Sequence, residues 1–187
     1  RVALIGADVE YSRNALDGAR ANAKKHGMEI VFDRSYPPST TEFTSVVRAM
    51  QAANPDVVFA ATLPIDTSGI IRAANEIKFK PKIIGGAMLG LLVTGIKQQL
   101  GPMINGSISN EFYIPAPSLQ FAGTGQMMAE YQKRAKDLGL DPLGYTYPPY
   151  AYAAGQILAK AVTETKSLND DVLAKYLAAN TFDTVIG

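Results

Sequence analysis

The sequence predicts an α/β fold, a doubly wound parallel sheet of five strands flanked by helices. Five short runs rich in Val and Ile recur through the first two thirds of the 187 residues. Their centres lie about 26 residues apart, which is the spacing of repeated strand–helix units. Between the runs, apolar residues follow the three- and four-residue steps of amphipathic helices. This alternation predicts right-handed crossover connections between parallel strands.

The predicted strands are short and mostly apolar, as the run VVFA at 57–60 illustrates. Continuous apolar strands of this kind are typical of a sheet that is covered on both faces. The five strands are predicted at residues 2–5, 29–32, 57–60, 82–84 and 106–109.

Three helices are predicted between these strands. The first ends at Gly27, because glycine commonly closes a helix. The second begins at cap candidates in 39–41 and ends at Asn54, which precedes a proline. The third stops before Pro81. Their predicted buried stripes are Ala15, Ala19, Ala23 and His26, then Val46, Val47 and Met50, then Ile70, Ile71, Ala74 and Ile77.

The pattern changes after residue 110. Two prolines remove backbone donors within 112–117, which excludes a central strand and predicts an extended linker. Three helices follow: one closes at Gly139, one begins at Pro148, and one spans about 170–179 with Asn169 or Asp170 as its cap. Because these helices have no sheet of their own, we expect part of their partner surface to lie outside this chain. Their predicted apolar faces comprise Met128, Tyr131, Ala135, Leu138, Ile157, Leu158, Ala161 and Val162.

Composition and charge exclude several functional classes. The chain holds 18 Lys+Arg and 17 Asp+Glu residues, a formal net charge of +1 without a basic block, so no nucleic-acid partner is expected. It has no Cys and one His, which excludes disulfides, Cys-based zinc sites, Cys nucleophiles and thiol redox chemistry. The longest largely apolar run, residues 85–96, is too short to cross a bilayer, so no direct membrane insertion is expected.

The loops that follow the strands show no catalytic machinery. Ligands of open parallel sheets bind beyond the carboxyl ends of the strands. Here those loops are 6–13, 61–68 and 85–91. They hold neither the G-x-G-x-x-G dinucleotide fingerprint nor a Walker lysine. Asp8, Glu10 and Asp66 suit either a paired-carboxylate site or solvated and helix-terminal charges. We predict no catalytic residue, metal site or cofactor, and we expect His26 to complement a helix C-terminus.

Aromatic residues gather ahead of the second of the later helices. Four of the nine Tyr fall between Tyr145 and Tyr152. Such a cluster suits a packed loop that enters a helix, or one wall of a small-molecule pocket, since tyrosine offers flat apolar area and a hydroxyl. A Pro-rich docking peptide is a third interpretation. Tyr11, after the first strand, either packs on its own helical turn or lines a pocket.

Several stretches of the sequence together resemble a known family. They are GADVEYSRN at 6–14, YPPSTTEFTSVV at 36–47, NPDVVFAA at 54–61, INGSISNEFYIP at 104–115 and YAYAAGQILAKAV at 150–162. In this order they resemble the periplasmic type 1 substrate-binding proteins of branched-chain amino acid ABC transporters, the leucine/isoleucine/valine-binding family. The resemblance spans nearly the whole chain but only the later half of a usual member. Because the chain also lacks an initiator Met, we expect it to be a piece of a longer protein.

This resemblance implies a domain organisation and a set of partners. Residues 1–112 would form the second ligand-binding lobe, 113–117 a hinge linker, and 118–187 helices that return to a first lobe, most of which is absent. The family closes two lobes on a small-molecule ligand. The implied function is capture in the periplasm and delivery to the membrane permease of an ABC importer, without turnover or a cofactor.

The resemblance also implies ligand-binding residues. Tyr11 matches a tyrosine that commonly lines the second-lobe side of the cleft, although Ser12 replaces the Gly of the usual Asp-x-x-Tyr-Gly motif. Leu63 aligns with a contact that is often aromatic in the family. Tyr147, with Tyr150 close behind it, matches an aromatic contact at the entry to the later helix.

One departure from the family pattern concerns the ligand. Amino-acid binders of the family usually place a carboxylate near the position of Ala87 and Met88, where it holds the ligand ammonium. This chain has none there, and an unpaired buried ammonium costs several kcal/mol. We therefore expect an amine-free apolar or aromatic carboxylate, capped by Leu63, Met88 and Leu89, whose anionic end the missing first lobe would hold.

Three alternatives stay open at this point. Within the family, the ligand would be a branched-chain or other hydrophobic amino acid. On the same fold, the chain would be the effector core of a transcription regulator. From another class, it would be a flavodoxin-like enzyme, which is disfavoured because no base, nucleophile or phosphate loop can be assembled.

Overall fold

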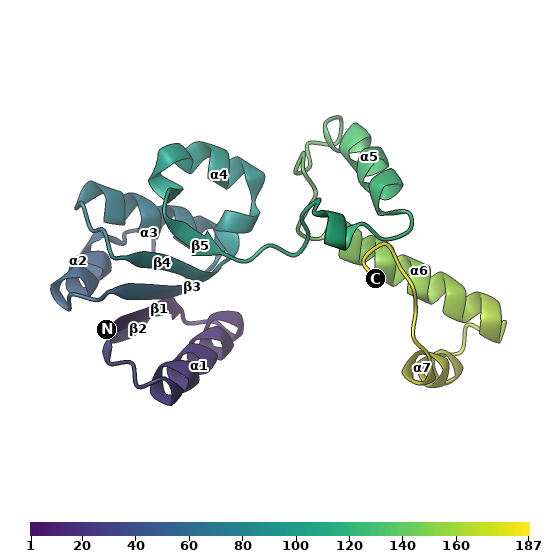
Figure 1. Cartoon of the computed structure of the whole chain (residues 1–187), viewed down its shortest axis with the longest axis horizontal. Coiled ribbons are helices and arrows are strands. Elements are labelled where there is room, and N and C mark those ends of the chain that lie inside the picture. The colour runs from purple at the N-terminus through teal and green to yellow at the C-terminus, as the bar shows by residue number, and fades with distance from the viewer. The chain divides into compact units, whose positions relative to one another are not determined.

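The computed structural model describes residues 1–187, which divide into two compact units (Figure 1). Unit 1 is Arg1–Asn110 and unit 2 is Glu111–Gly187. Each unit is described by itself.

Unit 1 is built on a five-stranded, wholly parallel sheet in the order β2-β1-β3-β4-β5. The predicted fold class and its five strands are confirmed. Four of the strands continue beyond their predicted ends. The strands are β1 (Val2–Ala7), β2 (Ile30–Tyr36), β3 (Val57–Thr62), β4 (Ile83–Met88) and β5 (Ser107–Ser109).

Helices cover the two faces of this sheet unequally. Helix α1 (Glu10–Lys25) lies on one face, whereas α2 (Thr44–Ala52), α3 (Pro64–Glu76) and α4 (Thr94–Leu100) lie on the other (Figure 1). Right-handed crossovers produce this arrangement, because the chain reverses its direction across the sheet only once, after β2. The sequence did not predict α4 or the 3₁₀ turn η1 (Leu89–Leu92) before it, since both are too short to show a helical period.

The start of α2 differs from its prediction. Residues 39–41 were expected to cap this helix, but it begins at Thr44. The carboxylate of Glu42 accepts a hydrogen bond from the Thr44 backbone N–H. The Thr44 side chain and this N–H together lower the pKa of Glu42. Phe43, just before the helix, is buried with its ring 5.2 Å from that of Tyr36 in an edge-to-face contact. We infer that this aromatic anchor sets where the helix begins.

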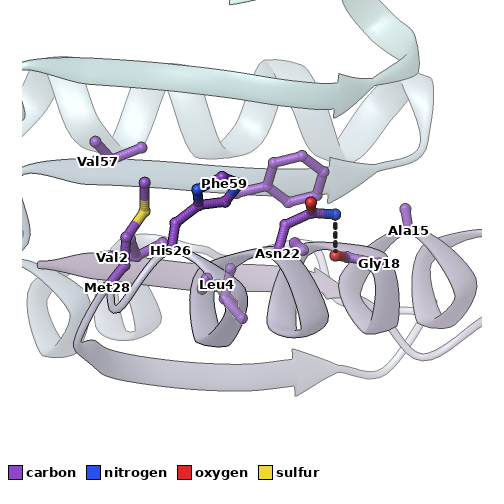
Figure 2. Close-up of a pocket in the computed structure, with 11 residues that line it drawn as sticks. Val2, Leu4, Ala15, Gly18, Asn22, His26, Met28, Val57 and Phe59 are labelled. Atoms are coloured by element: carbon purple, nitrogen blue, oxygen red, sulfur yellow. Dashed lines mark hydrogen bonds between the residues drawn. The ribbon is translucent and has the colours of Figure 1, made fainter.

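The core of unit 1 lies mainly between the sheet and α2–α4. Its fully buried members include Ile5, Val47, Met50, Val58 and Ile70. The α1 face has a smaller cluster, made of Val2, Leu4, Leu16 and Ala61. Between α1 and strands β1 and β3 this face is hollowed by an apolar groove of about 400 Å³ (Figure 2).

Unit 2 consists of the turn η3 (Pro117–Leu119) and helices α5 (Thr124–Ala135), α6 (Pro148–Thr165) and α7 (Asp170–Ala179). Two predictions are confirmed: α6 starts at Pro148, and Asn169 caps α7 by accepting the Val172 N–H at 3.2 Å. The predicted apolar faces are wrong in part, because Leu138 lies beyond α5 and is exposed, as is Leu158. None of the helices combines the length and apolarity that crossing a bilayer requires.

Candidate ligand-binding edge of the sheet

The carboxyl ends of β1, β3 and β4 bring three predicted site residues to one edge of unit 1. Tyr11 lies in the first turn of α1, directly after the loop that leaves β1. Its hydroxyl donates to the backbone oxygen of Ala87, near the end of β4, at 3.4 Å. The Tyr11 side chain therefore reaches past β3 to the end of β4, and 40% of the residue remains exposed. Tyr11 and the turn after β4 thus lie at the same end of the sheet.

Leu63 joins this edge from the end of β3. It is the N-cap residue of α3, and its half-buried side chain packs against the main core. Two residues later, Ile65 is 82% exposed, although it is a large apolar residue. Sequence reasoning missed Ile65. It lies in the first turn of α3, off the buried stripe of Ile70 and Ile71 and directly after the carboxyl end of β3. That position in the sequence is the signal that would have found it.

The structure corrects the role expected for Met88. Its exposed fraction is 0%, and it belongs to the core cluster between the sheet and the α2–α4 layer. Successive residues of a strand point to opposite faces, so Ala87, which is half-buried, faces the α1 side instead. Met88 therefore does not present an apolar cap at this edge. Its half-buried neighbour Leu89 lies closer to the surface.

The acidic residues of these loops do not form a pair. Asp8 accepts a hydrogen bond from Arg13 at 2.8 Å in an exposed ion pair. Asp66, in the first turn of α3, is buried and accepts the hydroxyl of Tyr36 at 3.1 Å. Burial raises the pKa of Tyr36 well above its usual value, and the negative charge of Asp66 raises it further. Glu10 is exposed at the start of α1. The three acids are thus a solvated ion pair and two helix-terminal charges.

Aromatic residues of unit 2 form a second candidate surface. The ring of Phe112 lies 6.0 Å from that of Tyr147 and 5.9 Å from that of Tyr150. The Tyr150 hydroxyl donates to the backbone oxygen of Phe112 at 3.0 Å. All three rings remain exposed, Tyr147 by 64%. The cluster is therefore packed locally and leaves aromatic area exposed; Phe112 was not predicted as part of it.

The edge contains no arrangement suited to a metal. No group of three or more His, Cys, Asp or Glu side chains is placed to hold an ion. His26 follows the last turn of α1, at its C-cap, as expected from the sequence.

Comparison with protein families and curated relatives gives a consistent result. The sequence model of the periplasmic binding protein family matches residues 1–187. The Leu/Ile/Val-binding protein homolog 7 of Brucella abortus (strain 2308) is 24% identical over 181 residues, which cover 96% of this chain and 44% of the relative. The Leu/Ile/Val-binding protein homolog 1 of Brucella suis biovar 1 (strain 1330) is 24% identical over 188 residues, 100% of this chain and 48% of the relative. The chain therefore spans about half the length of these curated relatives.

Solved structures share the fold. A leucine binding protein from Thermotoga maritima matches with a TM-score of 0.80 and 16% identity, over 100% of this chain and 51% of that one. A fatty acid ABC transporter substrate-binding protein from Thermomonospora curvata matches with a TM-score of 0.77 and 17% identity, over 99% and 47%. A leucine-, isoleucine-, valine-, threonine- and alanine-binding protein from Brucella ovis, in a closed conformation, matches with a TM-score of 0.72 and 22% identity, over 100% and 47%.

Proposed function

Because the chain belongs to the periplasmic binding protein family, we propose that it is part of the solute-binding receptor of an ABC importer. The family is one of binding proteins and not of enzymes. The sequence likewise contains no motif from which a catalytic site could be assembled. Its relatives are named for binding leucine, isoleucine and valine. The function is then capture of a small molecule and its delivery to a membrane permease.

In this proposal the two units serve different lobes. Unit 1 is the second ligand-binding lobe, and its contribution to the cleft is the edge that carries Tyr11, Leu63 and Ala87. Residues 113–117 form a hinge, and the helices of unit 2 belong to the first lobe. Tyr147 and Tyr150 contribute aromatic surface from that side. Ligand binding requires the rest of the first lobe, so it is tested in the full-length protein.

We propose further that the ligand is an amine-free apolar or aromatic carboxylate. The observation that supports this is the state of the acids at the edge. Between Ala87 and Leu89 there is no carboxylate, Asp8 is paired with Arg13, and Asp66 is buried beneath Tyr36. Glu10, exposed at the start of α1, is the remaining acid at this edge. An ammonium enclosed beside residues 87–89 would lose its hydration without gaining a partner there, at a cost of several kcal/mol. The apolar area of Leu63 and Ile65 suits a hydrocarbon body instead.

A ligand screen on the full-length protein tests both statements. We would compare leucine, phenylalanine, benzoate and hydroxycinnamate by thermal unfolding, because a ligand at 100 times its Kd stabilises the folded state by about 2.7 kcal/mol. Stabilisation by benzoate or hydroxycinnamate is the expected result. Stabilisation by the amino acids alone would show the ligand class to be wrong and the amino-acid alternative to be right. Turnover of an ester or phosphate substrate would overturn the receptor itself.

Three variants sharpen the screen. Tyr11→Ala removes ring and hydroxyl and should abolish most of the ligand-induced stabilisation, whereas Tyr11→Phe keeps the ring and should retain more of it. Glu10→Gln removes the exposed acid nearest to Tyr11 in sequence. Because an amine-free ligand needs no anion here, Glu10→Gln should leave binding unchanged. A loss of binding in Glu10→Gln would indicate an ammonium partner and contradict the proposed ligand class.

A further inference from the structure

Two loops that supply the candidate edge are joined by one buried side chain. Thr67 is the fourth residue of α3, at the end of its first turn, and has no exposed surface. Its hydroxyl oxygen accepts the backbone N–H of Gly90, in the turn after β4, at 3.0 Å. The same hydroxyl donates to the backbone oxygen of Leu63, at the end of β3, at 3.0 Å. One oxygen atom thus contacts both the loop after β3 and the loop after β4.

Counting donors and acceptors shows that this hydroxyl is saturated. Thr67 has one O–H donor and two acceptor lone pairs. The donor is used on Leu63 and one acceptor on Gly90, while the hydroxyl of Thr62 lies 2.6 Å away. Because the only proton of the Thr67 hydroxyl is already donated to Leu63, the bond between the two hydroxyls forms only if Thr62 donates and Thr67 accepts. All three bonds are then made in a buried site, where a lost partner costs the full desolvation penalty.

Gly90 fits against this site only because it has no side chain. A Cβ atom at Gly90 would lie 2.5 Å from the Thr67 Cβ and 2.6 Å from the Pro64 backbone oxygen. These distances are shorter than van der Waals contact allows, so a side chain at Gly90 would clash. The backbone of the turn after β4 therefore packs directly against the first turn of α3. A second buried bond, from Tyr36 to Asp66, attaches the same helical turn to the end of β2. The first turn of α3 is therefore held from two sides.

We propose that Thr67 is a positioning residue, which fixes Leu63 and the segment 87–90 as one preformed wall of the ligand-binding edge. Rigid spacing between the contacts of a site reduces the ordering cost of binding. The effect on ligand affinity rests on the receptor function proposed above, but the coupling of the two loops does not. The two parts are therefore tested by separate measurements.

Hydrogen exchange on the 187-residue chain tests the coupling without any ligand. Thr67→Val keeps the shape of the side chain and removes the hydroxyl, whereas Thr67→Ser keeps the hydroxyl. In Thr67→Val the Gly90 amide should exchange at least about tenfold faster, because it loses its acceptor. Exchange at Ile5 and Val58, in the central strands, should not change. Thr67→Ser should behave like the parent chain.

Several outcomes would overturn the proposal. An unchanged exchange rate of the Gly90 amide in Thr67→Val would show that the Thr67 hydroxyl does not stabilise the turn after β4. Equal acceleration at Gly90, Ile5 and Val58, or failure of the variant to fold, would show that the network stabilises the whole core and not two loops. Gly90→Ala perturbs the same contact from the other side, and it should accelerate exchange in residues 88–92 with Thr67 intact.

Affinity in the full-length protein tests the consequence for binding. With any compound that the screen above identifies, Thr67→Val should weaken binding on the order of tenfold, and Thr67→Ser should restore it. Unchanged affinity together with accelerated exchange would show that the wall is fixed but that binding does not need it, which contradicts the positioning role. If none of the compounds binds, the proposed ligand class fails while the exchange result still decides the coupling.

Discussion

The two units of the chain reach stability by different means. Unit 1 contains a complete sheet and buries large apolar side chains such as Leu4, Ile5 and Ile70 without any exposure. Unit 2 has helices of comparable length, but its buried cluster is small. This cluster consists of Tyr113, Met127, Met128, Ala153 and Val185. Several of its apolar residues are exposed, Leu168 by 80%. The comparison teaches that an amphipathic pattern forms a helix but does not by itself supply the surface that the helix covers.

Separating the units should give the largest difference. We expect residues 1–110 to unfold in one cooperative thermal transition, because the sheet and its α2–α4 layer contain their own core. Residues 111–187 should show helical content without a cooperative transition, since the buried apolar cluster of this unit contains only five residues. Circular dichroism during heating measures both. A sharp transition for residues 111–187 alone would break the comparison.

A matched pair of core truncations should give the next largest effect. Ile5→Ala removes a fully buried side chain from the central strand β1, and we expect it to lower the free energy of unfolding by about 2–5 kcal/mol. Met128→Ala in α5 should cost less, about 2 kcal/mol at the lower end of this range, because a small cluster relaxes around the lost volume. Urea titration of the whole chain, followed by hydrogen exchange in each unit, compares them. Equal losses would show that the core of unit 2 is as well packed as that of unit 1.

The same contrast explains which predictions from sequence succeeded. Strand and helix positions follow from local periodicity, so the five strands and the Asn169 cap were predicted correctly. Met88 was placed wrongly because the strand was expected to stop at 84, before two glycines. The strand continues to Met88, and alternation along it turns that side chain into the core. The exposure of Leu158 depends on what lies against α6, and no pattern within the chain contains that information.

Two tyrosine hydroxyls allow a third test of the comparison. Tyr36→Phe leaves the buried Asp66 without its donor and should cost about 1–3 kcal/mol. Tyr131→Phe, in unit 2, removes a bond to the Asp141 backbone oxygen from a partly exposed site and should cost about 0.5–1.5 kcal/mol. Denaturant titration at neutral pH gives both values. A larger loss for Tyr131→Phe would contradict the difference in burial.

The pH dependence of the Tyr36 variant provides its control. Burial raises the pKa of Tyr36 in the folded chain, so its contribution to stability is complete below the unfolded pKa of about 10 and is lost as the pH rises above that value. Tyr36→Phe cannot ionise at this position. Its stability should therefore fall less steeply than that of the parent chain on the alkaline side of pH 10. Parallel curves would show that the hydroxyl is not shielded from water.

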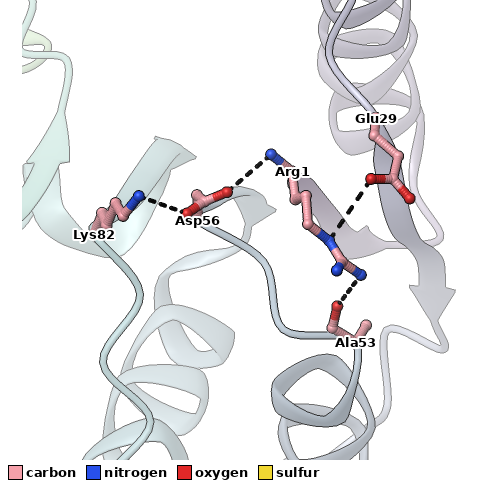
Figure 3. A network of polar contacts seen from close by, with 5 residues as sticks. All are labelled: Arg1, Glu29, Ala53, Asp56 and Lys82. Carbon is pink, nitrogen blue, oxygen red and sulfur yellow. Dashed lines mark hydrogen bonds and ion pairs between the residues drawn. The ribbon is translucent and has the colours of Figure 1, made fainter.

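The smallest effect is expected at the surface, where the units should no longer differ. Asp56 forms an ion pair with Lys82 (Figure 3), and this partner is the largest cause of the lowered pKa of Asp56, which is about 2. Because the folded pKa lies below the unfolded one, the stabilisation is present above about pH 4 and is lost as the pH falls toward 2. Asp56→Asn should lower the melting temperature slightly near neutral pH, and this effect should shrink as the pH falls through about 2 and vanish only below that value.

The matched change in unit 2 is Glu130→Gln, which breaks an exposed pair with Arg134 within α5. Exposed pairs are screened by solvent and salt, so both substitutions should have small effects that shrink further at high ionic strength. Thermal unfolding at low and high salt measures this. If the two surface substitutions behave alike while the two core truncations differ, the distinction between the units lies in their apolar packing. A large loss of melting temperature in Asp56→Asn that persists at high salt would instead show that charge contributes to the difference between the units.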